Sequence, residues 1–558
     1  MKNLLCFILL VSNYEIISQT YLQPQLLRDI NPTMNPFFTD LKKVGHQVFF
    51  FASDSAYNNT FWASDGTAEG TREVKEINPG PNADWWSLQH DISTSIIGMR
   101  DTAYFFAYRD DIGYELWKSA GHDSNTVLVK DINPGPGSAL PTLNESVVIH
   151  PIVFQNLFFF VAYRPDIGYE VWRSNGTEAG TFPVSNIPGN NPSLYPTYLQ
   201  VVGNRLFFAT DTWGTTEPGG FYASDGTPAG TFQFSNLIPS HLMPMKSLFF
   251  PQVGEWIYFS ARETGNGNNE LFRVKEDLSV VELVYDFNQD NEGDPTQFSY
   301  VSGGFLFQVR NGSTGGADHL ALLCNGTVNI NEPLLLESGI PIEGDNWIAW
   351  NNRVLIQTQD DSIYVSDGTQ TGTRSLGLAG NINGLSAQGM STYSLPYGEN
   401  IIFIFDDDDF TYLMISNGTE EGTFPLLDPQ RWYPRSNMAL KGDTLFIELI
   451  DDSNPDLGIE LYTLNLSDLP SHLFKNDEKG LSHIIYPNPS KGQVSIEGAS
   501  IGSLVEVRSL EGLLIESFRL DAEKTIRFNS GIAHGHYLLT WLDSKTGKII
   551  TSRTVLLP

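Results

Sequence analysis

A string of eleven residues recurs along the chain and constrains its fold more than any other feature. The first copy is FWASDGTAEGT at residues 61–71, and near copies begin at Val171, Phe221, Ile363 and Leu413. Glycine adopts positive φ without strain, and Asp or Asn can bond its own downstream backbone amides, so each copy predicts a tight turn between two strands. The predicted turn residues are Asp65, Gly66, Asn175, Gly176, Asp225, Gly226, Asp367, Gly368, Asn417 and Gly418.

The residue two places before the turn serine marks the same place in every copy of the repeat, and we call it the ruler position. It is mostly aromatic, and successive copies are 42 to 55 residues apart by subtraction: Trp62, Trp117, Trp172, Tyr222, Phe272, Leu322, Tyr364, Met414 and Tyr462. This spacing is typical of the blades of a β-propeller. Within one period, YLQVVGNRLFFATD and GFYASDG followed by TFQFSNL predict two hairpins, which together make one four-stranded blade.

A second recurring string predicts how the ring closes. LLRDINP begins at Leu26, REVKEINP at Arg72 and VLVKDINP at Val127, so the first copy precedes every blade. The ninth unit ends in ELYTLN and has no such string after it. We therefore expect an all-β chain with a single large propeller of eight or nine four-stranded blades, in which the N-terminal strand completes the last blade. Closure would remove exposed sheet edges.

These strings resemble those of a known family. ELWKS from Glu115, EVWRS from Glu170 and the Ser-Asp-Gly-Thr-x-x-Gly-Thr copies are similar to the ELWxxDGT repeat proteins of Bacteroidota-type bacteria. The resemblance covers residues 26–465, and the units at Phe272, Leu322 and Tyr462 depart from the motif. The resemblance implies a repeat scaffold and no single activity.

The N-terminus reads as a secretory signal peptide over residues 1–18. Lys2 supplies the positive charge, residues 4–11 are apolar, and cleavage is expected near Ser18. The apolar run is too short to span a bilayer, and no later stretch reaches the required length. Removing the signal also removes Cys6, which leaves Cys324 without an internal disulfide partner. The propeller is then expected over residues 19–465.

The tail reads as a separate module. A polar linker at 466–480 leads to a block at 481–558 with short alternating strands split by glycine turns, which predicts a small β-sandwich. It resembles the C-terminal sorting domain of type IX secretion, which implies export through the periplasm and the outer membrane, then release or surface anchoring. An adhesive sandwich module is the alternative. The matching residues are Tyr486, Pro487, Asn488, Pro489, Gly492, Gly535, Tyr537 and Gly547.

Candidate catalytic carboxylates recur with the period instead of being unique. Glu115, Glu170, Glu270 and Glu460 each precede the aromatic position by two residues, which indicates hydrogen-bonding groups of the scaffold. The sequence contains no HExxH, paired-cysteine or GxSxG motif, so zinc and serine-hydrolase chemistry are not expected. No catalytic or cofactor-binding residue is assigned.

One acidic stretch raises the question of a metal. DFNQDNEGD places oxygen-bearing side chains at alternate positions, as calcium-binding loops do. The candidate ligands are Asp286, Asn288, Asp290 and Asp294. Because Asp286 and Asn288 also align with the ordinary DINP turn, a solvated loop is the alternative interpretation. Calcium is the one candidate cofactor, and the fold does not require it.

Charge narrows the choice of partner. The formal net charge is −32 and basic clusters are lacking, which excludes nucleic acid as a partner. We expect a secreted or cell-surface protein, non-enzymatic, that binds an extracellular glycan or protein and has the type IX machinery as its export partner. The alternative is an extracellular carbohydrate-active enzyme, a glycosidase or lyase. Aromatic residues outside the ruler position could stack on sugars or pack in the core: Trp85, Trp86, Trp213, Trp347, Trp350, Trp432 and Tyr433.

Overall fold

The protein is described here from a computed structural model. The described residues run from 21 to 469 and from 485 to 556, without 32–34, 37, 54–58, 79–95, 141–150, 188–194, 212–219, 235–241, 245–249, 264–268, 288–291, 302–303, 312–318, 325–326, 330–345, 358–361, 370–371, 379–388, 407–409, 421, 487–492, 497–503, 509–513, 521–524, 528–534 and 543–548.

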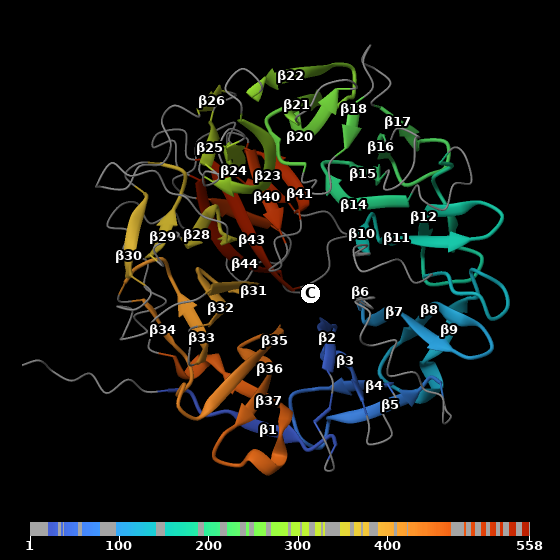
Figure 1. Ribbon diagram of the computed structural model, residues 1–558, viewed down its shortest axis with the longest axis vertical. Coiled ribbons are helices and arrows are strands. Elements are labelled where there is room, and N and C mark those ends of the chain that lie inside the picture. Colours follow the sequence, from blue (N-terminus) through green and yellow to red (C-terminus); the bar gives the residue numbers. More distant parts are fainter. Residues whose placement is uncertain are drawn as a thin grey trace, which may run out of the picture.

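Nine small antiparallel sheets are arranged in a ring and form a nine-bladed β-propeller (Figure 1). Eight of these sheets have four strands and one has five, as counted over the described residues. In blades 1 to 4 and 6 to 8, strands that follow one another in sequence are neighbours in the sheet, and Figure 1 shows the first strand of most of these blades nearest the middle of the ring. The predicted propeller is confirmed, and of the two expected blade numbers the larger one is correct.

The first four blades follow one another along the first half of the chain. Blade 1 has β2 (Phe38–Val44), β3 (Gln47–Ser53), β4 (Asn59–Ser64) and β5 (Arg72–Glu76); blade 2 has β6 (Ile97–Met99), β7 (Thr102–Arg109), β8 (Gly113–Ser119) and β9 (Val127–Lys130); blade 3 has β10 (Ile152–Phe154), β11 (Leu157–Arg164), β12 (Gly168–Ser174) and β13 (Phe182–Pro183); blade 4 has β14 (Tyr195–Val202), β15 (Arg205–Asp211), β16 (Phe221–Ser224) and β17 (Phe232–Gln233).

Blades 5 to 8 continue the ring with the same strand order, except that the first two strands of blade 5 both pair with its third strand. Blade 5 has β18 (Leu242–Pro244), β19 (Gln252–Val253), β20 (Trp256–Glu263), β21 (Glu270–Lys275) and β22 (Val281–Tyr285); blade 6 has β23 (Glu292–Val301), β24 (Gly304–Asn311), β25 (His319–Cys324) and β26 (Thr327–Asn329); blade 7 has β27 (Asn346–Trp350), β28 (Arg353–Gln357), β29 (Ser362–Ser366) and β30 (Arg374–Leu378); blade 8 has β31 (Gly389–Tyr397), β32 (Asn400–Asp406), β33 (Thr411–Ser416) and β34 (Thr423–Pro425).

Blade 9 closes the ring with strands from both ends of the propeller. Its sheet order is β1 (Gln25–Arg28), β37 (Ile459–Asn465), β36 (Thr444–Asp451) and β35 (Trp432–Lys441). β1 pairs antiparallel with β37, with Gln25 opposite Thr463 and Leu26 opposite Tyr462. Figure 1 shows the two strands side by side at the bottom of the ring. The N-terminal strand therefore completes the last blade, as predicted from the copy of the DINP string that precedes every blade.

A hydrophobic cluster lies at each of the nine contacts between neighbouring blades. Trp62 is 6% exposed and packs with Leu27 and Phe446 across the contact between blades 9 and 1. Trp117 packs with Phe61 between blades 1 and 2. The ruler position thus fills the space between blades, and its aromatic character follows from the large apolar area that must be buried there.

The remaining elements are short helices and a C-terminal block. The 3₁₀ helices η1 (Asp123–Asn125), η5 (Pro455–Leu457) and η6 (Leu466–Asp468) have three residues each. Nowhere in the described residues is a helix long and apolar enough to cross a membrane.

The C-terminal block is all β and has two sheets. One contains β38 (Ile485–Tyr486), β39 (Gln493–Ile496) and β42 (Thr525–Arg527). The other contains β41 (Leu514–Arg519), β40 (Leu504–Arg508), β43 (Gly535–Leu542) and β44 (Ile549–Leu556).

Candidate functional site

The recurring turn is held by its own side chains. In blade 4, Thr227 N and Thr227 Oγ1 donate to Asp225 Oδ1 at 2.9 and 2.7 Å, and Gly226 N donates to Ser224 Oγ at 3.0 Å. The side-chain hydrogen bond from Thr227 holds the pKa of Asp225 below its ordinary value. Gly226 has φ +88, which favours glycine at this place. The copies at Asp65, Asn175, Asp367 and Asn417 have the same contacts.

The serine and the final threonine of the string close the turn at its base. Their hydroxyl groups lie 2.6 to 2.7 Å apart in six blades, and the pairs are Ser64–Thr71, Ser119–Thr126, Ser174–Thr181, Ser224–Thr231, Ser366–Thr373 and Ser416–Thr423. Blade 2 keeps this pair although SAGHDSNT has replaced the motif there. The conserved element of the turn is thus the serine–threonine pair.

Several of the turns also accept a hydrogen bond from a cationic side chain of the preceding blade. Lys118 Nζ of blade 2 donates to Gly176 O of blade 3 at 2.8 Å. Arg173 Nη1 of blade 3 donates to Gly226 O of blade 4 at 2.9 Å. Arg72 reaches Gly121 O at 2.7 Å in the same direction round the ring. The sequence pattern did not reveal these cations, because lysine or arginine at the end of a strand is not distinctive.

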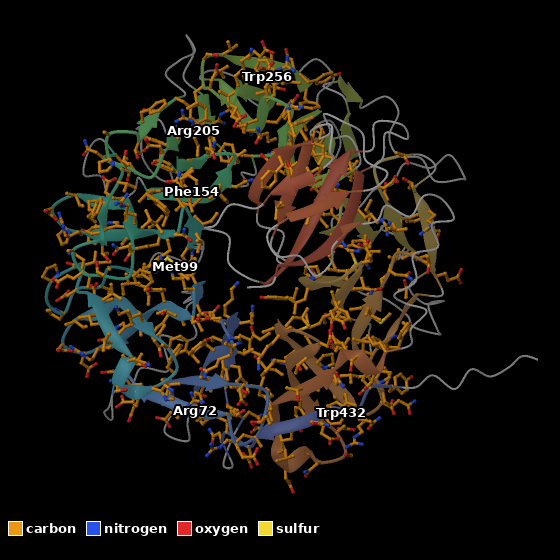
Figure 2. The ribbon with its side chains drawn as sticks, turned by 180° about the vertical axis from the view of Figure 1, so that it is seen from behind. Arg72, Met99, Phe154, Arg205, Trp256 and Trp432 are labelled. Carbon is orange, nitrogen blue, oxygen red and sulfur yellow. The ribbon has the colours of Figure 1, made fainter. Side chains whose placement is uncertain are left out.

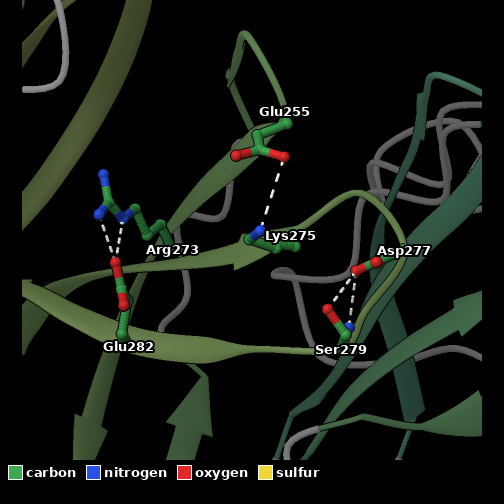
Figure 3. Close-up of polar contacts among 6 residues, drawn as sticks. All are labelled: Glu255, Arg273, Lys275, Asp277, Ser279 and Glu282. Carbon is green, nitrogen blue, oxygen red and sulfur yellow. Dashed lines mark hydrogen bonds and ion pairs between the residues drawn. The ribbon is translucent and has the colours of Figure 1, made fainter.

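Blade 5 shows that the turn chemistry survives where the motif is lost. Asp277 Oδ1 accepts from Ser279 N at 2.9 Å and from Ser279 Oγ at 2.6 Å (Figure 3). Nearby, Arg273 pairs with Glu282, and Lys275 Nζ lies 3.6 Å from Glu255 Oε2 (Figure 3). The sequence analysis missed this turn, and an Asx-x-Ser/Thr spacing is the sequence signal that could have identified it.

Buried glutamates accept hydrogen bonds from the turn that follows the outer strand in several blades. Glu115 Oε2 and Oε1 accept from Ile132 N and Asn133 N at 2.6 and 3.1 Å. Glu170 Oε1 accepts from Ile187 N at 2.9 Å. Glu270 accepts from the backbone of Phe287. Burial raises the pKa of Glu115 to about 8 and of Glu170 to about 6. These repeated contacts agree with the predicted scaffold role.

Glu448 is a buried carboxyl group that does not belong to the repeat. Glu448 on β36 is 5% exposed, and burial raises its pKa to about 8, which a hydrogen bond with Asn437 and the charge of Arg435 partly offset. A raised pKa is typical of a catalytic acid. However, Glu448 Oε1 is inaccessible to solvent, so a substrate cannot reach it as the protein stands.

The inner strands carry the exposed tyrosines. Tyr198 on β14, Tyr300 on β23 and Tyr393 on β31 are 36%, 38% and 54% exposed. In contrast, the exposed apolar residues Leu26, Val127 and Phe232 lie on outer strands. Figure 2 shows from the opposite side that inner strands lie nearer the middle of the ring than outer strands. Met99 of inner strand β6 lies nearer the middle than Arg72 of outer strand β5.

Bulges reshape several of these inner strands. The pairing register shifts in β2, β14, β23, β31 and β35. Tyr198 lies in the bulge of β14 with φ +57, and Tyr393 lies in the bulge of β31. A bulky residue with positive φ is strained, and bulges commonly redirect a side chain near a functional site. No sequence motif marks these positions, so the pattern analysis missed both tyrosines.

Several predicted site residues lie partly or wholly outside the described part of the chain. Of the calcium candidates, Asp286 follows β22 and Asp294 lies on β23, whereas Asn288 and Asp290 lie outside the described residues. Of the sorting residues, Tyr486 lies on β38, and Gly535 and Tyr537 lie on β43; Pro487, Asn488, Pro489, Gly492 and Gly547 lie outside, as does the signal peptide.

Of the aromatic residues outside the ruler position, Trp350 and Trp432 lie in the core, Trp347 and Tyr433 are half-buried, and the other three lie outside the described residues. Trp350 and Trp432 are each 5% exposed, so for these two the packing interpretation is correct. Trp85, Trp86 and Trp213 lie outside the described residues.

The fold defines the class of protein, a nine-bladed propeller followed by a separate β block, and comparisons with known proteins add three likenesses. No protein-family model and no curated protein matches the chain. Among solved structures it is 13% identical to PorZ of Porphyromonas gingivalis, an essential bacterial surface component of the type-IX secretion system; the match covers 92% of this chain and 75% of PorZ, with a TM-score of 0.29.

Two other solved structures match over shorter parts of the chain. The computationally designed Ika8 protein is 14% identical over 68% of this chain and 96% of its own, with a TM-score of 0.34. The polysaccharide lyase Uly1 is 13% identical over 60% and 93%, with a TM-score of 0.33. At these TM-scores the likenesses carry no inference about ligand or activity.

Proposed function

We propose that this protein is an exported, non-enzymatic propeller that binds an extracellular glycan through the inner strands of its ring. The observation that carries the proposal is the placement of Tyr198, Tyr300 and Tyr393, the exposed tyrosines of the described residues, on three inner strands. A tyrosine ring offers an apolar face to a sugar ring, and its hydroxyl group can donate to a sugar oxygen even where it accepts from the protein, as Tyr300 Oη does from Gln252 N at 2.7 Å.

The backbone supports this proposal. Tyr198 has φ +57, a conformation that Gly or Asn would adopt at lower cost. The strain suggests that the tyrosine is kept for its side chain, which the bulge redirects. Tyrosine is also common at protein interfaces, so a protein ligand is the alternative outcome of the binding test.

Export is the second part of the proposal. The expected signal peptide, the resemblance of residues 481–558 to a type IX sorting domain and the all-β fold of that block support passage to the cell surface or the medium. The formal net charge of −32 supports solubility and disfavours nucleic acid as a ligand.

The binding proposal is tested with an array of polysaccharides that differ in sugar composition and linkage. The full chain should bind at least one of them, and Tyr198→Ala and Tyr393→Ala should each lower the affinity by about 3- to 10-fold, because one stacking contact is lost. Phe232→Ala is the matched control, since Phe232 is 41% exposed on outer strand β17. Binding that is equal in all three variants would contradict the proposed surface.

A further inference from the structure

Blades 2 and 3 carry the same hairpin between their second and third strands. YRDDIGYE at 108–115 and YRPDIGYE at 163–170 differ at one position. In each hairpin two tyrosine rings pack together, with centroids 5.2 Å apart for Tyr108 and Tyr114 and 5.0 Å apart for Tyr163 and Tyr169. All of these tyrosines except Tyr169 are half-buried, so part of each ring is open to solvent. Two neighbouring blades therefore present the same aromatic pair.

Each hairpin also holds an ion pair at the surface. Arg109 Nε and Nη2 donate to Asp111 Oδ1 and Oδ2 at 2.5 and 3.0 Å, and Arg164 and Asp166 make the same contacts at the same distances. Both aspartate side chains are 64% exposed. A paired arginine and aspartate together have no net charge, and they offer hydrogen-bond donors and acceptors to a ligand. Neither hairpin thus has an excess of positive charge.

Backbone contacts join the two hairpins to each other and to blade 4. In the loop that leads from blade 2 to blade 3, Ala139 N donates to Tyr114 O at 2.9 Å, and Ala139 O accepts from Tyr163 N at 2.8 Å. Toward blade 4, Leu199 of inner strand β14 packs in the same cluster as Tyr163. Leu199 directly follows Tyr198, the strained tyrosine in the bulge of β14. The tyrosines therefore continue from blade 2 across blade 3 to the proposed glycan site.

We propose that the tyrosine row, which consists of Tyr108, Tyr114, Tyr163 and Tyr198, binds several sugars of a linear, neutral polysaccharide. This inference rests on the proposed glycan-binding function and names the class of glycan. Two matching hairpins on neighbouring blades offer the same contacts twice, which fits a ligand whose own chemistry repeats. The tyrosine rings offer apolar faces to sugar rings, and the arginine–aspartate pairs can bond sugar hydroxyls. A polyanion is disfavoured, because the hairpins have no excess of positive charge and the chain is strongly acidic.

Oligosaccharides of increasing length, prepared from cellulose, xylan, laminarin and amylose, test the row by calorimetry on the full chain. In at least one series the affinity should rise about tenfold or more from the disaccharide to the longest member, because further sugars reach further tyrosines. Tyr108→Ala and Tyr163→Ala should each lower the affinity for the longest member by about 3- to 10-fold. Tyr397→Ala is the matched control and should bind as the parent does. Tyr397 is also half-buried, but it adjoins the turn between the first two strands of blade 8, at the opposite end of the blades.

A second measurement needs no variant, which matters because Tyr163 also packs against its own blade. In hydroxyl-radical footprinting of the parent chain, the longest oligosaccharide should protect Tyr108 and Tyr163 from oxidation and leave Tyr397 unprotected.

The outcomes separate this inference from the proposed function. Affinity that is independent of length, or protection of Tyr198 without Tyr108 and Tyr163, would overturn the tyrosine row and leave glycan binding in place. Binding of none of the four series would overturn the neutral class. In that case, a charged polysaccharide that binds on the array would keep the proposed function, whereas an array without any binding would overturn both.

Discussion

At the scale of single residues, environment gives the acidic side chains two opposite roles. Asp65 and Asp225 lie at exposed turns, where hydrogen bonds from Thr67 and Thr227 hold the pKa of each below its ordinary value. Glu115 and Glu170 are buried behind the outer strands, where desolvation raises the pKa. The turn aspartates are therefore stabilised as anions, whereas burial favours the neutral form of the two glutamates, and near pH 7 only Glu115 is mostly neutral.

This difference predicts a pH dependence of stability. The pKa of Glu115 rises to about 8 in the folded chain from an ordinary value of 4.5, so its contribution is fully present below pH 4.5 and is lost as the pH rises through 8. Between these values the folded state holds one more proton, and the free energy of unfolding should fall by up to about 1.4 kcal/mol per pH unit. Glu115→Gln cannot ionise and should flatten this slope, as measured by urea denaturation in chelator at several pH values.

Glu170→Gln is the matched control for that experiment. The pKa of Glu170 is raised only to about 6, so its removal should change the slope below pH 6 and leave the range from 6 to 8 as in the parent. A slope between pH 6 and 8 that is equal in the parent and in Glu115→Gln would contradict the assignment.

At the scale of elements, the sequence predicts the strands and packing positions that recur in every blade, but it does not predict features that occur in single blades. The hairpins, the aromatic packing positions and the closing strand follow from strings that repeat with the blade period. The blade number stays between eight and nine in the sequence, because the units at Phe272 and Leu322 have lost the turn motif while keeping their strands. The bulges at Tyr198 and Tyr393 depend on the cross-strand register, which no single string encodes.

We predict that the N-terminal strand β1, which closes the ring, is needed for the stability of the propeller. Deleting residues 19–33 removes β1, exposes the edge of β37 and takes Leu27, 4% exposed, out of the cluster between blades 9 and 1. Losing a buried leucine alone costs about 2 to 5 kcal/mol, so the melting temperature should fall well beyond the effect of trimming a disordered end. Deleting 481–558 is the control, since it removes no propeller strand. An unchanged melting temperature after loss of β1 would contradict closure by this strand.

At the scale of the whole molecule, the propeller and the C-terminal block have separate sheets. Among the described strands, none from β38 to β44 pairs with a propeller strand, and the ring closes through β1 and β37. The propeller therefore has a complete set of blade contacts without the tail. This separation is what a removable export signal requires, because the cargo must keep its fold after the signal is cleaved.

The last prediction assigns export to that tail. A chain ending at residue 470 should fold and bind its ligand as the parent does, but accumulate in the periplasm of a host with type IX secretion. Residues 471–558 fused to an unrelated protein with a signal peptide should carry that protein to the cell surface or the medium. Cell fractionation, with proteolysis of intact cells to test exposure, measures both, and the fused protein without the tail is the control. If the shortened chain reaches the outside at the parental level, the tail is a structural module and export depends on another part of the chain.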